Sequence, residues 1–264
     1  MSLQIIGLSK KYGSFFPVKN LNFHVDTGDI LGYLGANGAG KTTTMKIMAG
    51  ILQPTSGEVL WQGKNIAHSL DEYKKDIGYV PENCELYGYL SPFEYLQLVG
   101  RLRLIEENVL QKKIHELLSA FGLTLETHQP LSHFSKGMKQ KVLILSALLH
   151  NPKILFLDEP LSGLDMDSTL LIRELIKCLA AEGKIIVFSC HVLEVVEKLC
   201  TRVLIIKKGK QVLDENINNF GLLKSSHSLE STFKELTCTI DHRSKAQEVL
   251  GIIHTKIMEK ANDN

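Results

Sequence analysis

A glycine-rich stretch at residues 35–43 reads GANGAGKTT and could bind phosphate. Glycines let a backbone curl so that its N–H groups point inward at phosphate oxygens. The apolar run Ile30–Leu34 predicts a strand before the loop, and Thr42–Ala49 predicts a helix after it, whose N-terminal end would add positive potential. A glycine-rich turn with an incidental lysine is the plainer alternative, but the flanking strand and helix favour phosphate binding. In that case Lys41 would reach the β- and γ-phosphates of a nucleotide, and Thr42 would hold Mg²⁺.

Two acids, Asp158 and Glu159, follow the apolar run Ile154–Leu157. A strand of this kind is buried on both faces, and open α/β sheets bind ligands at the carboxyl ends of their strands. Asp158 would contact Mg²⁺ directly or through water, and Glu159 would polarise the water that attacks a γ-phosphate. Two alternatives stay open: Asp158 as a turn cap, and both acids as metal ligands without a catalytic base.

Three further polar features lie beside apolar segments. His191 follows the apolar run Ile185–Phe188, where a neutral imidazole could hydrogen-bond a γ-phosphate, although a lone histidine there is more often a satisfied buried side chain. The stretch LSGLD at residues 161–165 fits a turn with a helix N-cap. Ser135, in FSKGM, precedes a long apolar helical run, and a serine there caps a helix well.

The elements that must position these residues alternate between strand and helix, which favours a parallel α/β sheet. Besides the strands already mentioned, short strands are predicted at Val59–Trp61, Ile77–Val80 and Val203–Ile206, and a helix at Ser168–Ala181. Residues 92–150 carry mostly helical spacing and look like an inserted subdomain. Helical spacing returns at residues 228–236 and 246–258.

Composition excludes several classes of protein. The 264 residues include 30 Lys and Arg against 29 Asp and Glu, without the basic excess of a nucleic-acid binder, and Lys207–Lys210 reads as a strand end and turn. No apolar stretch approaches the roughly 18 residues of a membrane span, and no signal peptide is visible. The five cysteines form no CxxC pair, so we expect reduced thiols in a cytoplasmic protein.

Together these motifs resemble the ATP-binding subunit of an ABC transporter over residues 1 to about 215. The loop at residues 35–43 resembles the Walker A motif, which assigns nucleotide contacts to Gly35, Asn37, Gly38, Ala39, Gly40, Lys41, Thr42 and Thr43. ILFLDEP resembles Walker B with its catalytic glutamate, LSGLD the D-loop, and His191 the switch histidine. Tyr12 matches the aromatic residue that stacks on adenine, with Phe15 or Phe16 as competitors for that role.

Phe134–Met138 falls where this family has its LSGGQ signature, which covers the γ-phosphate held by a second ATPase subunit. The resemblance therefore implies that Ser135, the Gly137 N–H group and the helix N-terminus bind a nucleotide in trans. Lys136 and Met138 depart from the family pattern. So does Glu82, where the family usually has glutamine; its oxygens would still serve Mg²⁺ or water, with a negative charge added near Asp158 and Glu159.

The stretches YVPE and SKGM are most like the ABC-2-type export ATPases. The resemblance implies a P-loop NTPase core with a mostly parallel sheet, an N-terminal antiparallel β region and an inserted helical subdomain at about 83–150. The ATPase domain would span 1–215, and 216–264 would be a C-terminal helical extension. ATP and Mg²⁺ are the implied cofactors.

The implied partners are a second ATPase subunit, identical or related, and integral membrane permease subunits, which would hold the chain at the inner face of the cell membrane. Asn83–Gln97 would meet the permease, unless its large side chains form a local core instead. A soluble ABC-type ATPase in a non-transport process is the alternative function. A regulatory module without turnover is disfavoured by Glu159 and His191.

Overall fold

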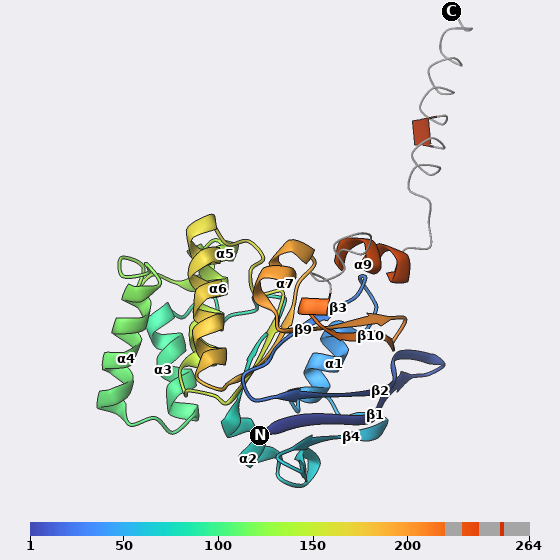
Figure 1. The fold of residues 1–264 in the computed structure, drawn as a ribbon. Coiled ribbons are helices and arrows are strands. Elements are labelled where there is room, and N and C mark those ends of the chain that lie inside the picture. Colours follow the sequence, from blue (N-terminus) through green and yellow to red (C-terminus); the bar gives the residue numbers. More distant parts are fainter. Residues whose placement is uncertain (220–228, 238–248, 251–264) are drawn as a thin grey trace, which may run out of the picture.

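The computed structural model describes residues 1–219, 229–237 and 249–250, and two sheets dominate this part of the chain (Figure 1). None of the helices in the described ranges is long and apolar enough to span a membrane. In chain order the elements are β1 (Ser2–Tyr12), β2 (Phe15–Asp26), β3 (Ile30–Leu34), α1 (Lys41–Met48), β4 (Ser56–Trp61), β5 (Lys64–Asn65), η1 (Ile66–His68), α2 (Leu70–Asp76), β6 (Ile77–Val80), α3 (Pro92–Leu102), α4 (Glu107–Ala120), η2 (Leu131–His133), α5 (Lys136–Leu148), β7 (Ile154–Asp158), α6 (Met166–Ala181), β8 (Ile185–Ser189), α7 (Leu193–Leu199), β9 (Arg202–Lys207), β10 (Lys210–Asn216) and α9 (Leu229–Thr237).

The larger sheet has the strand order β10-β9-β3-β8-β7-β6, with all neighbours parallel except the edge pair β10 and β9. Its central strands β3, β7 and β8 are buried along their whole length. Successive side chains alternate between two apolar clusters: Leu155 and Leu157 face the helices α3–α6, whereas Ile154 and Phe156 face α1 and the second sheet. This two-sided burial explains why the strands read as continuous apolar runs.

The smaller sheet is antiparallel, with the order β2-β1-β4-β5. Leu3 of β1 pairs with Val25 of β2 on one side and with Trp61 of β4 on the other, and all three are buried. Met45 and Met48 of α1 belong to the same apolar cluster, so α1 is held between the two sheets. The position of α1 matters because the glycine-rich loop leads into it.

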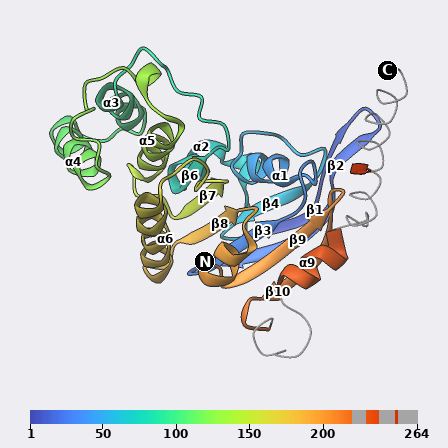
Figure 2. The ribbon, with the colours of Figure 1, turned by 90° about the horizontal axis from the view of Figure 1, so that it is seen from above.

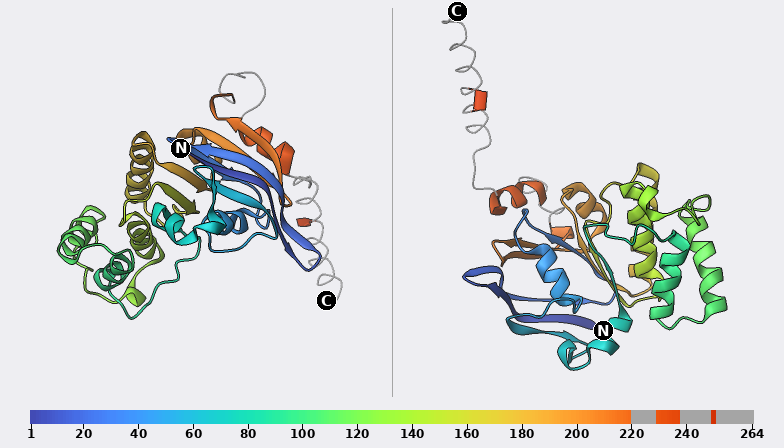
Figure 3. Two further views of the ribbon diagram at one scale, coloured as in Figure 1. Left: turned by 90° about the horizontal axis from the view of Figure 1, so that it is seen from below. Right: turned by 180° about the vertical axis from the view of Figure 1, so that it is seen from behind.

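Helices α3, α4 and α5 lie between β6 and β7 in the chain and form a lobe at the far end of the molecule from β1 and β2 (Figures 2 and 3). A capping box of Ser91 and Glu94 begins α3. Gly100 allows α3 to approach α4 closely, because a Cβ there would lie 2.2 Å from Leu110 Cδ1.

The fold predicted from the sequence is confirmed: a mostly parallel sheet, an antiparallel region and inserted helices are all present. Lys207 ends β9 and Lys210 begins β10, with Lys208 and Gly209 in the left-handed conformation of a turn. The helix expected over 228–236 is α9, whereas the helix expected over 246–258 lies almost wholly outside the described residues. Four cysteines are free thiols, and Cys238 lies outside the described ranges.

Candidate functional site

The glycine-rich loop connects the end of β3 to the start of α1 and needs glycine for steric reasons. Gly40 has a φ of 109°, and a Cβ on it would lie 2.1 Å from the carbonyl oxygen of Pro17. At Gly35 a Cβ would lie 2.7 Å from the carbonyl oxygen of Ile206. Lys41 Nζ donates to the Gly35 carbonyl oxygen at 2.7 Å, so the ammonium group lies across the loop. The curled backbone, the cation and the N-terminus of α1 together form a site suited to an anion.

Asp158 ends β7 and is 1% exposed. Ser189, its register partner at the end of β8, donates its hydroxyl proton to Asp158 Oδ1 at 2.6 Å. Asp158 Oδ2 is buried and has no hydrogen-bond partner in the described structure. An unpaired buried carboxylate oxygen is costly unless another group takes it up, and a cation is the natural candidate.

Glu159 turns away from the strand with a φ of 50°, in the left-handed region that non-glycine residues rarely occupy. Its N–H group donates to Ser189 Oγ at 2.9 Å, so one serine fixes both acids. Its Oε2 lies 2.8 Å from Nδ1 of His191, whose side chain is 73% exposed while that of Glu159 is 12% exposed. The pair could accept a proton and pass it toward solvent.

The glycine-rich loop and Glu159 lie at a cleft of about 400 Å³. It is lined by Phe15, Pro17, Asn37, Gly38, Gly40, Lys41, Thr42, Thr43, Glu82 and Glu159. The structure thus brings the loop, Glu82 and Glu159 together from three separate segments. Tyr12 is not among the lining residues, although it pairs with Phe15 across the β1–β2 hairpin. Both aromatic side chains are exposed, at 52% and 61%, and Phe15 is the one that reaches the cleft.

No cluster of three His, Cys, Asp or Glu residues that could hold a metal occurs in the described part of the chain. The oxygen donors that line the cleft include the Thr42 hydroxyl and the acids Glu82 and Glu159, and buried Asp158 directly precedes Glu159 in the chain. This sparse oxygen set fits Mg²⁺, which keeps several water ligands and binds proteins through one or two carboxylates together with nucleotide phosphates.

Ser135 and Gly137 do not line this cleft. Ser135 caps α5, since its Oγ accepts from the Met138 N–H group at 3.2 Å, which is the structural role considered from sequence. Gly137 packs against the 161–165 turn: a Cβ there would lie 2.4 Å from the carbonyl oxygen of Gly163. Lys136 Nζ donates to Ser162 Oγ at 2.8 Å, so the start of α5 is joined to the 161–165 turn by a side-chain hydrogen bond as well.

Ser189 is a site residue that sequence reasoning did not identify. The sequence does show a hydroxyl side chain at the end of the predicted strand before His191. The sequence around Ser189 does not show, however, that this hydroxyl contacts Asp158. That contact depends on the register between β7 and β8, which is a non-local property.

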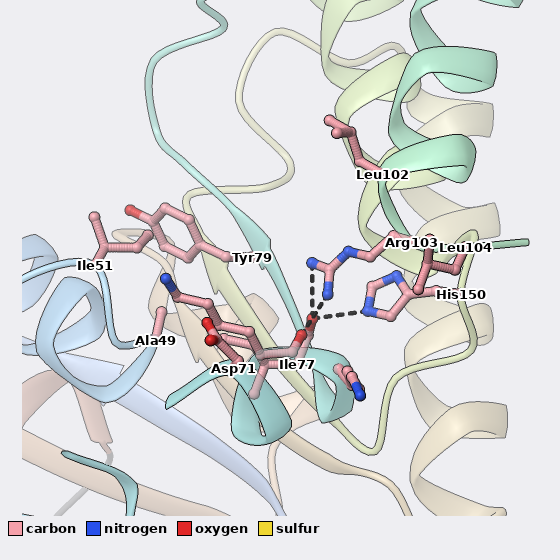
Figure 4. Close-up of a pocket in the computed structure, with 11 residues that line it drawn as sticks. Ala49, Ile51, Asp71, Ile77, Tyr79, Leu102, Arg103, Leu104 and His150 are labelled. Atoms are coloured by element: carbon pink, nitrogen blue, oxygen red, sulfur yellow. Dashed lines mark hydrogen bonds between the residues drawn. The ribbon is translucent and has the colours of Figure 1, made fainter. Parts of the chain in front are cut away.

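A second and larger cavity, of about 690 Å³, lies where β6 meets the ends of α2, α3 and α5 (Figure 4). Arg103 and His150 both reach the Ile77 carbonyl oxygen, at 3.4 and 2.8 Å. Burial and the nearby Arg103 charge lower the pKa of His150 to about 4, so its ring is neutral at neutral pH. The cavity walls also include Ile51 and Leu102, which are largely exposed.

Comparison with known proteins gives a consistent result. The family model described as ABC transporter matches residues 18–162. An uncharacterized ABC transporter ATP-binding protein of Bacillus subtilis, YhcH, is 37% identical over 222 residues, covering 82% of this chain and 72% of the relative. The bacitracin transport ATP-binding protein BcrA of Bacillus licheniformis is 41% identical over 204 residues, covering 77% and 66%.

Solved structures agree with the sequence matches. An ATP-binding subunit of an ABC transporter superposes with a TM-score of 0.82 at 30% identity, covering 89% of this chain and 99% of that one. A dimeric ATP-binding cassette, MJ0796, in a post-hydrolysis state bound to ADP and Pi, superposes with a TM-score of 0.75 at 25% identity, covering 81% and 98%.

Proposed function

We propose a function from a premise that the comparisons supply: this chain belongs to the ABC transporter family and is an ATP-binding, ATP-hydrolysing subunit of a transport system. The proposed function is to power a separate membrane permease by pairing head-to-tail with a second ATPase subunit. The observation that carries the proposal is the division of motifs: the loop, Glu82 and Glu159 line one cleft, whereas Ser135 and Gly137 lie outside it. We therefore assign Ser135 and Gly137 to a nucleotide that is held in the cleft of another chain.

In the proposed site the N–H groups of the glycine-rich loop, residues 35–43, and the Lys41 ammonium group bind the phosphates. Thr42 and Asp158 would hold Mg²⁺, with Glu82 nearby; when bound, the metal neutralises charge on the β- and γ-phosphates. The unpaired Oδ2 of buried Asp158 supports this role. Phe15 and Tyr12 are the candidates for stacking on adenine, and the position of Phe15 in the cleft wall favours it.

Hydrolysis would use Glu159 as the base. Its carboxylate accepts a proton from the attacking water, and the ring of His191, 2.8 Å away, orients the carboxylate and can hydrogen-bond the γ-phosphate. A purely metal-binding role for both acids is the competing assignment. The two are separable, because a glutamine at 159 keeps a ligand oxygen but cannot accept a proton.

We assign residues 1–215 to the ATPase domain, with its helical subdomain at about 83–150, and 216–264 to a C-terminal extension. The proposed direction of transport is export. It is supported by the resemblance of YVPE and SKGM to the ABC-2-type export ATPases, and by the similarity to a relative named for bacitracin transport. The permease would hold this chain at the cytoplasmic face of the membrane.

Two surfaces could meet the permease. Tyr87 and Tyr89, in the Asn83–Gln97 segment, are 55% and 77% exposed, with ring centroids 5.9 Å apart. The 690 Å³ cavity offers apolar walls with an excess of basic side chains from Lys74, Lys75 and Arg103 over Asp71, which suits a short helix with an acidic end. We assign both to the permease interface, because the cavity is lined by β6, which precedes Glu82, and the two tyrosines follow Glu82 in the chain.

The test is Glu159→Gln with ATP and Mg²⁺, measured by size-exclusion chromatography with light scattering. Because nucleotide still binds but is not hydrolysed, a dimer should accumulate with ATP and not with ADP. The matched control Glu182→Gln, an exposed position at the end of α6, should hydrolyse ATP as the wild type does. A Glu159→Gln chain that stays monomeric with bound ATP would argue against the head-to-tail pairing.

A further inference from the structure

Gln140 is a fully buried polar side chain in α5, with 0% exposure among the apolar residues Val142, Leu143 and Ile144. Its Oε1 accepts a hydrogen bond from the Cys84 thiol at 2.8 Å. Its Nε2 is buried and has no hydrogen-bond partner in the described structure. The amide is therefore only half satisfied, and its thiol partner is a weak donor.

A half-satisfied buried amide is a poor stabilising device. Leaving a buried donor unpaired costs free energy, whereas an apolar side chain of similar volume would avoid that cost. The contact does, however, fix a position: it joins residues 56 apart in sequence.

The two ends of this contact lie beside two different functional segments. Cys84 is two residues after Glu82, which lines the nucleotide cleft of its own chain. Gln140 is in the first turns of α5, which begins just after its cap, Ser135. Glu82 lies in the segment between β6 and α3, residues 81–91, whose far end is fixed separately by backbone bonds from Leu131 to Leu90 and from Ser132 to Gly88. The Cys84–Gln140 contact joins α5 to the end of this segment that is nearest the cleft.

We propose that the Cys84–Gln140 hydrogen bond is a positioning link that couples Glu82, at the chain's own nucleotide, to the start of α5, which serves the nucleotide of the paired subunit. The inference rests on the proposed head-to-tail pairing. When Glu82 engages its nucleotide, the link draws Gln140 with it and sets the placement of Ser135 and Gly137. Because coupling between sites is reciprocal, occupancy of the second site also favours the engaged position of Glu82.

The test compares steady-state ATPase activity against ATP concentration for four variants of the full chain. Cys84→Ala and Gln140→Met remove the link, Cys84→Ser keeps an O–H donor, and Cys178→Ala at an exposed free cysteine of α6 is the matched control. For two coupled sites, the wild type and Cys178→Ala should give a Hill coefficient clearly above about one, and Cys84→Ala and Gln140→Met should bring it to about one with a several-fold lower kcat. Cys84→Ser should restore both values.

Thermal unfolding separates positioning from packing. Gln140→Met should keep or raise Tm while it lowers kcat, because the unpaired amide is gone. The inference would be overturned if Cys84→Ala and Gln140→Met lost activity only as far as their Tm falls and if Cys84→Ser did not restore activity. If the wild type has a Hill coefficient above about one and Cys84→Ala and Gln140→Met have the same Hill coefficient, the inference would also be overturned. If the wild type has a Hill coefficient of about one and the Glu159→Gln variant stays monomeric with ATP, the head-to-tail pairing itself would be overturned. The proposed link would then fail with it.

Discussion

Asp158 and Glu159 are adjacent in the chain, yet their side chains have very different surroundings. Asp158 is buried and bound by Ser189, with one oxygen left over. Glu159 leaves the strand through a left-handed φ and meets an exposed histidine. The surroundings suit Asp158 to holding a cation and Glu159 to handling a proton, so the backbone turn between them separates the two roles.

Ser189→Ala tests how far one hydroxyl organises both acids. Within the described part of the chain, the substitution leaves the buried Asp158 side chain without a hydrogen-bond partner, and it removes the acceptor of the Glu159 N–H group. We expect a loss of about 1–3 kcal/mol in the free energy of unfolding, measured with urea, and a fall in kcat larger than the change in KM. Ser146→Ala, which removes a hydroxyl that donates to the Leu143 carbonyl oxygen and does not line the cleft, is the control and should leave kcat near wild type. Unchanged kcat and stability in Ser189→Ala would contradict this role.

The sequence predicted the residues of the glycine-rich loop and the two acids because their spacing is local and the flanking strand and helix can be read beside them. It could not predict Ser189, whose contact depends on strand register, nor that Phe15 reaches the cleft and Tyr12 does not. Those facts depend on how segments far apart in the chain meet.

The start of α5 and the 161–165 turn are in close contact, through the Lys136–Ser162 hydrogen bond and the packing of Gly137 on Gly163. Gly137→Ala should separate them, because its Cβ would lie 2.4 Å from the Gly163 carbonyl oxygen. We expect nucleotide affinity, measured by fluorescence titration, to remain near wild type while ATPase activity falls at least about tenfold. The control Gly88→Ala introduces a Cβ 3.4 Å from Ser132 Cβ, an ordinary contact, and should leave activity intact. Equal activity in both variants would show that the close approach has no functional role.

The junction of β6 with the end of α5 should make stability depend on pH. The pKa of His150 is lowered to about 4, chiefly by burial and then by the charges of Arg103, Lys113 and Lys184. His150 therefore binds a proton more readily in the unfolded chain than in the folded chain. The contribution of neutral His150 to the free energy of unfolding is fully present above about pH 6.5 and is lost as pH falls toward 4.

His150→Gln keeps an N–H donor for the Ile77 carbonyl oxygen but cannot titrate. Urea unfolding at pH 7 and pH 5 should give a smaller loss of stability in this variant than in the wild type, with a difference of at most about 1.4 kcal/mol per pH unit. His68→Gln, at an exposed position, should lose as much as the wild type. An identical pH dependence in His150→Gln and the wild type would contradict the assignment.

At the scale of the whole molecule, the strand–helix order in the sequence was enough to predict the parallel sheet and the inserted helices, because buried strands and amphipathic helices have distinct periods. The resemblance seen in the sequence already implied that Ser135 and Gly137 serve the nucleotide of a second subunit, but it did not show which residues line the cleft. The structure separates Ser135 and Gly137 from the cleft that their own chain forms. This separation is why the account requires two chains for one complete ATP site.

The most direct test mixes two inactive chains, Lys41→Ala and Ser135→Asp, and measures ATPase activity. Aspartate caps a helix as well as serine does but repels phosphate, so α5 should stay folded; Ser135→Asn, an uncharged cap, is the control and should remain active alone. In mixed dimers one site combines an intact loop with an intact signature. We expect recovery of up to about a quarter of wild-type activity at equal concentrations, because random pairing makes half of the dimers mixed and each mixed dimer has one intact site of two. Mixed dimers that form, by light scattering and affinity-tag exchange, but hydrolyse no ATP would contradict it.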